Sequence, residues 1–192
     1  MFAGRYNWMP LLLLLLPAIA VAGVIKHVEH DHWTDEYDHY FRKYTKHYFG
    51  PFFNWKWFKA QGIAESGLKA NAKSSVGAKG IMQIMPATYK EISASNPHIS
   101  DISTPRWNIA AGIYYDRQLY RRWRKQHPLQ AQEQLSFALA SYNAGFGNIR
   151  SAFRRANKKH NKIREWTQVA PFAPNETRNY VKRIHALMQV DD

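Results

Sequence analysis

The sequence contains no cysteine. Disulfide bonds, thiolate catalysis and cysteine metal sites are therefore excluded, and so is a lipoprotein anchor, which needs an acylated cysteine. Acidic residues are also scarce: 14 Asp and Glu stand against 27 Lys and Arg, which gives a formal net charge of +13. Such an excess of positive charge indicates an anionic partner, such as peptidoglycan, lipid headgroups or nucleic acid.

The shortage of acidic residues is most pronounced in the body of the chain. Between Arg42 and Val190, 25 Lys and Arg accompany only seven carboxylates. The seven are Glu65, Glu91, Asp101, Asp116, Glu133, Glu165 and Glu176. A glycosidase built from this chain must draw its catalytic acid from that short list.

The sequence also lacks alternating strand patterns of useful length and internal repeats. Helical periodicity is present instead, and the first helix is marked by an aromatic stripe at Trp33, Tyr37, Tyr40, Tyr44 and Tyr48. Further helices are expected over residues 54–68, 82–92, 107–123, 132–142, 147–156 and 177–188, with a loop at 74–80, a connector at 96–104 and a basic irregular stretch at 157–172. We therefore predict a mostly α-helical domain over residues 40–190.

The N-terminus carries an uncharged apolar run, Met9 to Ile25, between Arg5 and Lys26. Its length lies at the short edge for a membrane-spanning helix. Small residues near its end also fit a secretory signal with an A-x-A-like cleavage site. We predict that residues 1–26 form a hydrophobic helix that is either a cleaved signal peptide or a retained membrane anchor. In both cases residues 9–25 direct the chain to the cell envelope or periplasm.

Residues 27–39 (HVEHDHWTDEYDH) are polar and are predicted to be a linker. Their imidazoles, at His27, His30, His32 and His39, lie among carboxylates that could bind a metal. Because no spacing among them matches a known ligand pattern, a solvated stretch is the better interpretation.

Glu65 is the best candidate for a catalytic acid. It lies late in a predicted helix whose neighbouring members, Ile63, Ala64 and Leu68, are apolar. A carboxyl group in such surroundings is partly desolvated, and desolvation raises its pKa toward the range that general acid catalysis requires. A single Glu on a helix is more often a solvated surface group, so the residues around Glu65 decide the matter.

Five blocks follow one another along the chain: residues 64–67 (AESG), 74–86 (SSVGAKGIMQIMP), 108–115 (NIAAGIYY), 138–147 (ALASYNAGFG) and 176–181 (ETRNYV). Together they resemble the ordered motifs of the lytic transglycosylase catalytic domain, which is related to soluble lytic transglycosylases of family 1. Ordered blocks of this kind make chance similarity improbable. Two positions depart from the pattern: Ile81 replaces the usual Leu, and Ala70 stands where many members have Pro.

The resemblance implies a fold similar to that of goose-type lysozymes and an activity on peptidoglycan. By that resemblance, Glu65 protonates the β-1,4 glycosidic oxygen between N-acetylmuramic acid and N-acetylglucosamine. It then deprotonates the C6 hydroxyl of the muramoyl residue, which closes a 1,6-anhydro ring. One carboxylate suffices because the attacking hydroxyl is tethered to the reacting sugar. No metal or organic cofactor is implied.

The resemblance also implies supporting residues around Glu65. Substrate contacts are expected from Ser66, Ser74, Met82, Gln83, Tyr142 and Asn143, and Tyr180 is expected near the carboxylate, where it would help to set the pKa. Other interpretations stay open for several of them. The two serines can serve helix-end and turn hydrogen bonds, Met82 can be a core side chain, and Asn143 can simply end a helix.

Alternative functions remain open. The basic clusters at 121–125 (RRWRK) and 150–164 suggest nucleic-acid binding, but no nucleic-acid-binding motif accompanies them, and anionic envelope polymers or lipid headgroups are the better match. A non-catalytic wall-binding domain is disfavoured by the Glu65–Ser66 pair. A lysozyme-type hydrolase would need a positioned water, usually with a second carboxylate nearby, and Glu91, Asp101 or Asp116 facing Glu65 would favour it. The source of the chain could be a bacterium or a phage. A phage enzyme would be located in the virion or in the envelope of the infected bacterium.

Overall fold

The computed structural model describes residues 33–160 and 162–189. The apolar run at 9–25, most of the predicted linker and most of the imidazoles lie outside the described residues. Within the described ranges no strand is present, and the only β-type pairing is two isolated bridges, Lys73 to Lys79 and Lys79 to Ile84. The prediction of a mostly helical domain is confirmed. No helix of these ranges is long and apolar enough to cross a membrane.

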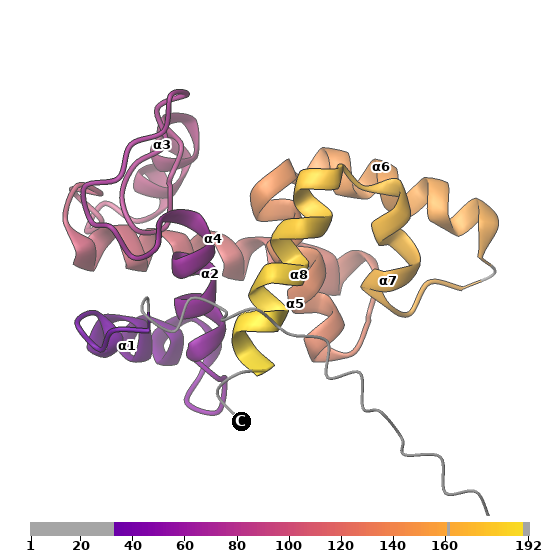
Figure 1. The fold of residues 1–192 in the computed structure, drawn as a ribbon, viewed down its shortest axis with the longest axis horizontal. Coiled ribbons are helices and arrows are strands. Elements are labelled where there is room, and N and C mark those ends of the chain that lie inside the picture. The colour runs from indigo at the N-terminus through magenta and orange to yellow at the C-terminus, as the bar shows by residue number, and fades with distance from the viewer. Residues whose placement is uncertain (1–32, 161, 190–192) are drawn as a thin grey trace, which may run out of the picture.

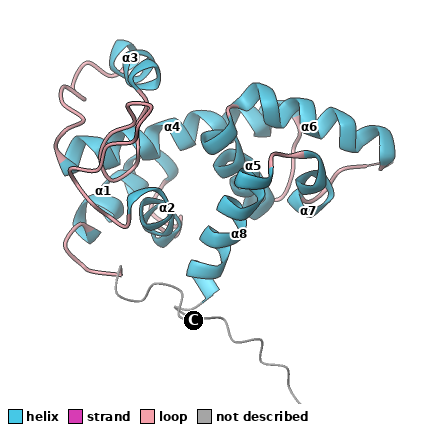
Figure 2. Cartoon of the chain, turned by 45° about the horizontal axis from the view of Figure 1, so that its top comes forward, coloured by secondary structure: helices cyan, strands magenta, loops and turns pink. Residues whose placement is uncertain are grey.

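The helices, in chain order, are α1 (Asp38–Phe49), α2 (Lys56–Ser66), α3 (Pro86–Ser95), α4 (Pro105–Gln126), α5 (Ala131–Ala144), α6 (Phe146–Lys159), α7 (Trp166–Val169), the 3₁₀ helix η2 (Ala170–Phe172) and α8 (Asn175–Gln189). The long helix α4 packs against α1 on one side and α5 on the other, and α2 packs against α8. Figures 1 and 2 show α1, α2 and α3 gathered around the first half of α4, with α5 to α8 around its other end.

The core is dense in aromatic side chains where α4, α5 and α6 meet. Trp123 has no exposed surface, and its ring lies within 5.6 Å of the ring centroids of Phe137, Phe146 and Phe153. Its indole N–H donates to the hydroxyl of Ser141 at 2.8 Å, so this buried donor is satisfied. The aromatic centre fixes the relative positions of the three helices.

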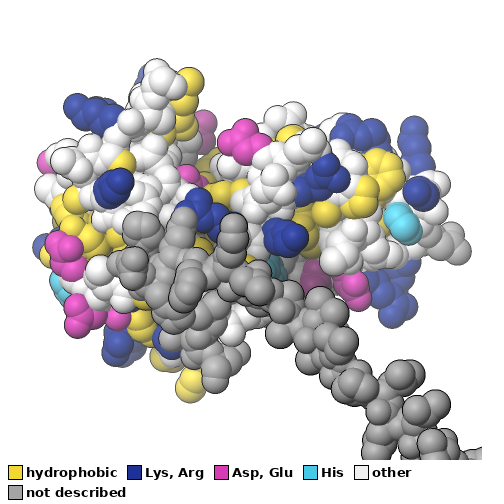
Figure 3. Space-filling model, in the orientation of Figure 1, with side chains coloured by type: hydrophobic (Ala, Val, Ile, Leu, Met, Phe, Trp, Pro, Cys, Tyr) yellow, Lys and Arg dark blue, Asp and Glu magenta, His cyan; other side chains and the backbone are white. Residues whose placement is uncertain are grey.

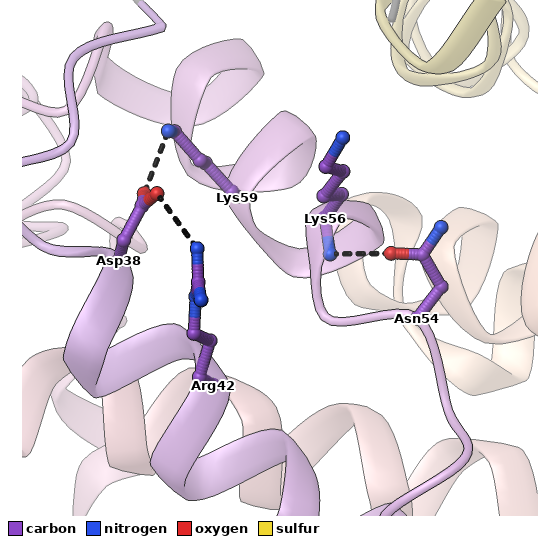
Figure 4. Close-up of polar contacts among 5 residues, drawn as sticks. All are labelled: Asp38, Arg42, Asn54, Lys56 and Lys59. Carbon is purple, nitrogen blue, oxygen red and sulfur yellow. Dashed lines mark hydrogen bonds and ion pairs between the residues drawn. The ribbon is translucent and has the colours of Figure 1, made fainter. Parts of the chain in front are cut away.

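A buried lysine joins α1 to α2. Lys59 is only 4% exposed, and its ammonium lies 2.6 Å from a carboxylate oxygen of Asp38, as Figure 4 shows. The indole of Trp33 lies 5.0 Å from the same ammonium. A buried charge needs such a partner, because its desolvation is otherwise unfavourable. At the start of α2, the side-chain carbonyl of Asn54 accepts from the backbone N–H of Lys56 at 3.0 Å.

Two predicted segments differ from the structure. The helix expected at 82–92 begins only at Pro86, because Gly80 and Gln83 adopt positive φ angles of 73° and 45° that a helix does not allow. The stretch 157–172, predicted to be irregular, contains the end of α6, all of α7 and η2. The stretch was predicted to be irregular because it is rich in basic residues, but Glu165 and Gln168 form a capping box at the start of α7. The first helix begins at Asp38, so the end of the predicted linker is helical.

Candidate active site

Glu65 lies in the last turn of α2. The helix ends there because Gly67 and Leu68 adopt left-handed conformations, and the N–H groups of both residues bond back to the carbonyls of Ile63 and Gly62. Glycine favours such an ending because it has no Cβ. Glu65 is therefore carried on a rigid helix end directly before a sharp turn.

The Tyr180 hydroxyl, from α8, donates a hydrogen bond of 2.6 Å to Oε1 of Glu65. On the same helix, Nη1 of Arg183 donates to the backbone carbonyl of Ala64 at 3.3 Å. These contacts belong to the packing of α2 on α8. They bring together residues that lie 115 positions apart in the sequence.

Burial raises the pKa of Glu65 to about 7, because desolvation disfavours the charged form. The hydrogen bond from Tyr180 and the positive charge of Arg183 both lower this pKa, and the negative charge of Glu176 raises it. Burial also raises the pKa of Tyr180 well above its usual value, so this hydroxyl stays protonated and remains a donor. A carboxyl group that titrates near neutral pH can both give and take a proton at working pH.

The loop that follows α2 is fixed by Asn108 on α4, a residue of the 108–115 block with almost no exposed surface. Its amide donates to the carbonyls of Lys79 and Ile102, both at 2.9 Å, and its Oδ1 accepts from the N–H of Met82 at 2.7 Å. Sequence reasoning did not assign Asn108 a role. Asn at the buried face of a predicted helix was the signal, since a buried amide must find partners.

Of the predicted substrate residues, the serines and Met82 already have partners within the protein. Ser66 donates to the carbonyl of Ile81 at 2.9 Å and accepts from the N–H of Lys69, and Ser74 accepts from the N–H of Ala78 at 3.0 Å. The Met82 side chain has no exposed surface. These contacts show local structural roles, and their contacts with a sugar stay predictions.

The other predicted residues, Gln83, Tyr142 and Asn143, are partly exposed. Tyr142 donates to the carbonyl of Met82 at 2.8 Å, and the carbonyl oxygen of the Asn143 side chain accepts from the Thr177 hydroxyl at 2.7 Å. The Gln83 amide donates to the carbonyl of Gly80 at 2.9 Å. The Tyr142 bond ties the 74–86 loop to α5, and the Asn143 bond ties α5 to α8. Figure 3 shows the surface hollowed between the part that carries α3 and the part that carries α6.

Asp116, on α4, is a second carboxyl group near Glu65, and it lies inside the core with no exposed surface. Gln61, one helical turn before Glu65 on α2, donates from its amide to Oδ1 of Asp116 at 3.4 Å. Within the described part of the chain, Oδ2 of Asp116 and Oε1 of Gln61 have no hydrogen-bond partner. Burial raises the pKa of Asp116 well above its usual value, with the negative charge of Glu65 adding to the effect.

The two other carboxylates considered for a hydrolase are on the surface. Asp101 accepts from the backbone N–H and the hydroxyl of Ser103 at 2.8 and 2.7 Å, in an exposed turn. Glu91 is exposed on α3. Asp116 is too deeply buried to hold a water molecule against a bound sugar. Among the described residues, no group of three or more His, Asp and Glu is placed to hold a metal ion.

The basic cluster at 121–125 offers exposed charge but no exposed aromatic ring. Its arginines and lysine are exposed, but Trp123 points into the core and cannot stack on a base. Arg122 instead covers the ring of Phe146, 3.8 Å from its centroid. The second cluster lies mainly on the exposed face of α6.

Comparisons with known proteins agree with the helical fold. Residues 52–165, more than half of the chain, match the family described as the transglycosylase SLT domain. The structure is similar to the 70 kDa soluble lytic transglycosylase of Escherichia coli, with a TM-score of 0.67 and 28% identity over 84% of this chain and 24% of that one. The same enzyme has been solved in complex with bulgecin A.

Curated relatives point to the same family. The membrane-bound lytic murein transglycosylase F of Vibrio parahaemolyticus is 27% identical over 78% of this chain, and that of Photobacterium profundum is 30% identical over 70%. This chain spans 30% and 24% of those relatives' own lengths. The helical fold and the family match define a lysozyme-like transglycosylase domain. The chain belongs to the transglycosylase SLT domain family.

Proposed function

We propose that this protein is a peptidoglycan lytic transglycosylase, with Glu65 as its single catalytic acid and base. The observation that carries the proposal is the Glu65 carboxyl group, whose pKa is raised to about 7 and whose Oε1 accepts from Tyr180, in a domain of the SLT family. The names of the relatives, lytic murein transglycosylases, support peptidoglycan as the substrate.

In the proposed reaction, protonated Glu65 first gives its proton to the glycosidic oxygen between N-acetylmuramic acid and N-acetylglucosamine. The bond from that oxygen to the anomeric carbon of the muramoyl residue breaks. The resulting Glu65 carboxylate takes the proton of the C6 hydroxyl, whose oxygen bonds to the anomeric carbon. The positive charge that develops on the ring is stabilised by the substrate's own N-acetyl group. The 1,6-anhydro sugar forms without water, and Glu65 ends protonated again.

The surroundings of Glu65 favour this route over hydrolysis. A hydrolase of the two-carboxylate kind needs a second carboxylate that positions water. Asp116 is enclosed in the core and Asp101 is engaged with Ser103. Gln83, Tyr142 and Asn143 are proposed to border the sugar sites, with Ser66, Ser74 and Met82 holding the loop that carries Gln83.

The proposed location is the cell envelope. Residues 9–25 would export or anchor the chain, and the membrane-bound relatives support an envelope location. The basic faces of α4 and α6 would then meet anionic wall polymers or lipid headgroups.

The test is mass spectrometry of the fragments released from purified peptidoglycan by the wild type and by Glu65→Gln. We expect 1,6-anhydromuramoyl products from the wild type and none from the variant. Reducing-end products would instead identify a hydrolase, and no release by the correctly folded wild type would contradict an enzymatic function. Circular dichroism of both proteins controls for folding.

A further inference from the structure

A pocket of about 570 Å³ lies between α1, the first turn of α4 and the segment that leads into α4. It is lined by Lys43, Tyr44, Lys46, His47, Tyr48, His98, Arg106 and Trp107. None of these residues belongs to the Glu65 site, whose partners come from α2 and α8. In Figure 1, α1 lies at the lower left and α8 crosses the centre. The volume is in the range of pockets that hold small ligands.

The charge of the pocket is entirely positive. Two lysines, one arginine and two histidines line it, and none of the described carboxylates does. Among the described residues, no salt bridge engages Lys43, Lys46 or Arg106. A concave surface with uncompensated positive charge attracts an anion.

Arg106 is held in one orientation. Its Nε donates to the hydroxyl of Tyr44 at 3.0 Å, and its guanidinium lies 4.4 Å from the ring centroid of Trp107. Tyr44 is itself buried, so it is a fixed anchor. The terminal nitrogens of a guanidinium fixed in this way are arranged to bind both oxygens of a carboxylate.

The aromatic side chains that line the pocket can contact the part of a ligand that Arg106 does not bind. Tyr44 lies between Trp107 and Tyr48, with ring centroids 6.3 and 6.4 Å away. The Tyr48 hydroxyl is buried and has no hydrogen-bond partner among the described residues, and burial raises its pKa to about 12, so it stays protonated. The rings of Tyr48 and Trp107 give the apolar part of a ligand a surface to pack against.

We propose that this pocket is a non-catalytic binding site for a carboxylate-bearing fragment of peptidoglycan, with Arg106 on the carboxylate and Trp107 and Tyr48 against the remainder. The identity of the ligand rests on the proposed function. A carboxylate on a flexible polymer can enter a concave pocket, whereas a lipid headgroup would have to leave the plane of its bilayer. The site would hold one part of the wall while Glu65 acts on another.

The test uses the full-length chain with Glu65→Gln, in nonionic detergent and labelled with 5-fluorotryptophan. The ¹⁹F resonance of Trp107, one of seven tryptophans, is assigned with Trp107→Phe and then followed during titration with a disaccharide–tetrapeptide muropeptide. Neutral diacetylchitobiose, inorganic phosphate and phosphatidylglycerol vesicles are titrated separately. The double variant Lys43→Glu/Lys46→Glu is compared with Arg121→Glu/Arg124→Glu, which makes the same charge change on the exposed part of α4.

We expect the Trp107 resonance to shift with the muropeptide and not with diacetylchitobiose. Lys43→Glu/Lys46→Glu should weaken this binding about tenfold or more, because charge-assisted contacts are the strong ones, and the α4 double variant should leave it unchanged. Arg106→Lys should weaken it about fivefold, because the charge remains but the planar fork is lost. Melting temperatures confirm that each variant is folded. If Arg106→Lys does not fold, Lys43→Glu/Lys46→Glu still tests the proposal, because both lysines are exposed.

The proposal is overturned if the Trp107 resonance does not respond to the muropeptide, or responds equally to diacetylchitobiose. Equal weakening by both double variants would mean non-specific charge attraction, and a response to vesicles or phosphate alone would assign a different ligand. Because Glu65→Gln is present throughout, the result does not depend on turnover. If the wild type released no anhydro product while Trp107 still titrated, the catalytic proposal would fail and the binding site would stand.

Discussion

The hydroxyl of Tyr180 donates a hydrogen bond of 2.6 Å to Oε1 of Glu65. This bond joins α8 to the end of α2 and favours the ionised carboxylate, so it opposes the effect of burial on the pKa of Glu65. Together with the charges of Arg183 and Glu176, these two effects leave that pKa near 7. The hydrogen bond therefore helps to set the pH range in which the proposed acid is protonated.

Removing this hydroxyl should shift the pH profile of the enzyme. In Tyr180→Phe the ionised form of Glu65 loses its donor, so the pKa rises and the protonated acid persists to higher pH. We expect the alkaline limb of kcat/KM on peptidoglycan to move up by about one pH unit. Tyr115→Phe, a partly buried tyrosine without a hydrogen bond to Glu65, is the control. An unchanged limb in Tyr180→Phe would show that the bond does not control the acid.

Two charges on α8 should act on Glu65 in opposite directions. Arg183 lowers the pKa of Glu65 and Glu176 raises it, so Arg183→Gln should move the alkaline limb to higher pH and Glu176→Gln to lower pH. Both side chains are exposed, and each shift should be a few tenths of a pH unit and diminish in 1 M salt. The pH profiles of both variants at low and high salt measure this. Shifts in the same direction would contradict an electrostatic origin.

Burial of Asp116 should make the protein less stable as the pH rises. Its pKa is raised in the folded state, so above the unfolded-state pKa of about 4 the unfolded chain releases a proton that the folded chain keeps. The resulting loss of stability is about 1.4 kcal/mol per pH unit until the folded pKa is reached. Asp116→Asn removes this dependence while it keeps the shape and supplies a donor for Gln61.

The measurement is urea unfolding of the wild type and Asp116→Asn at pH 4.5 and pH 7. We expect the stability of the variant relative to the wild type to increase between these pH values. Because Glu65 is present in both proteins, its own titration cancels in the comparison. A difference that does not change with pH would mean that Asp116 is ionised in the fold.

Much of this site could be predicted from sequence because its residues lie in ordered motifs. The helix with Glu65, the turn after it and the proximity of Tyr180 all follow from blocks whose order is diagnostic. The pairing of Gln61 with Asp116 could not be predicted, because α2 and α4 are brought together only by packing and neither residue belongs to a chemical motif on its own. The late start of α3 was missed for a related reason: Met82, Met85 and Tyr89 recur at helical spacing, while Asn108 holds the backbone of Met82 in a turn.

The loop that Asn108 holds by hydrogen bonds should not tolerate a side chain at position 80. A Cβ on Gly80 would lie 2.3 to 2.9 Å from three atoms of the Asn108 amide, and its φ of 73° is unfavourable for other residues. Gly80→Ala should therefore lower the free energy of unfolding by about 2–4 kcal/mol, from the positive φ and the overlap together.

Because Asn108 also holds the backbone of Met82, the activity of Gly80→Ala should fall even where the protein remains folded. Gly147→Ala is the matched control: it lies in α6 with nothing within 4 Å of the new Cβ, and Ala in a helix is more stable than Gly by about 1 kcal/mol. Urea unfolding and the release of fragments from peptidoglycan measure both variants. If Gly80→Ala were as stable and active as Gly147→Ala, the amide of Asn108 could not be the fixed element that holds this loop beside Glu65.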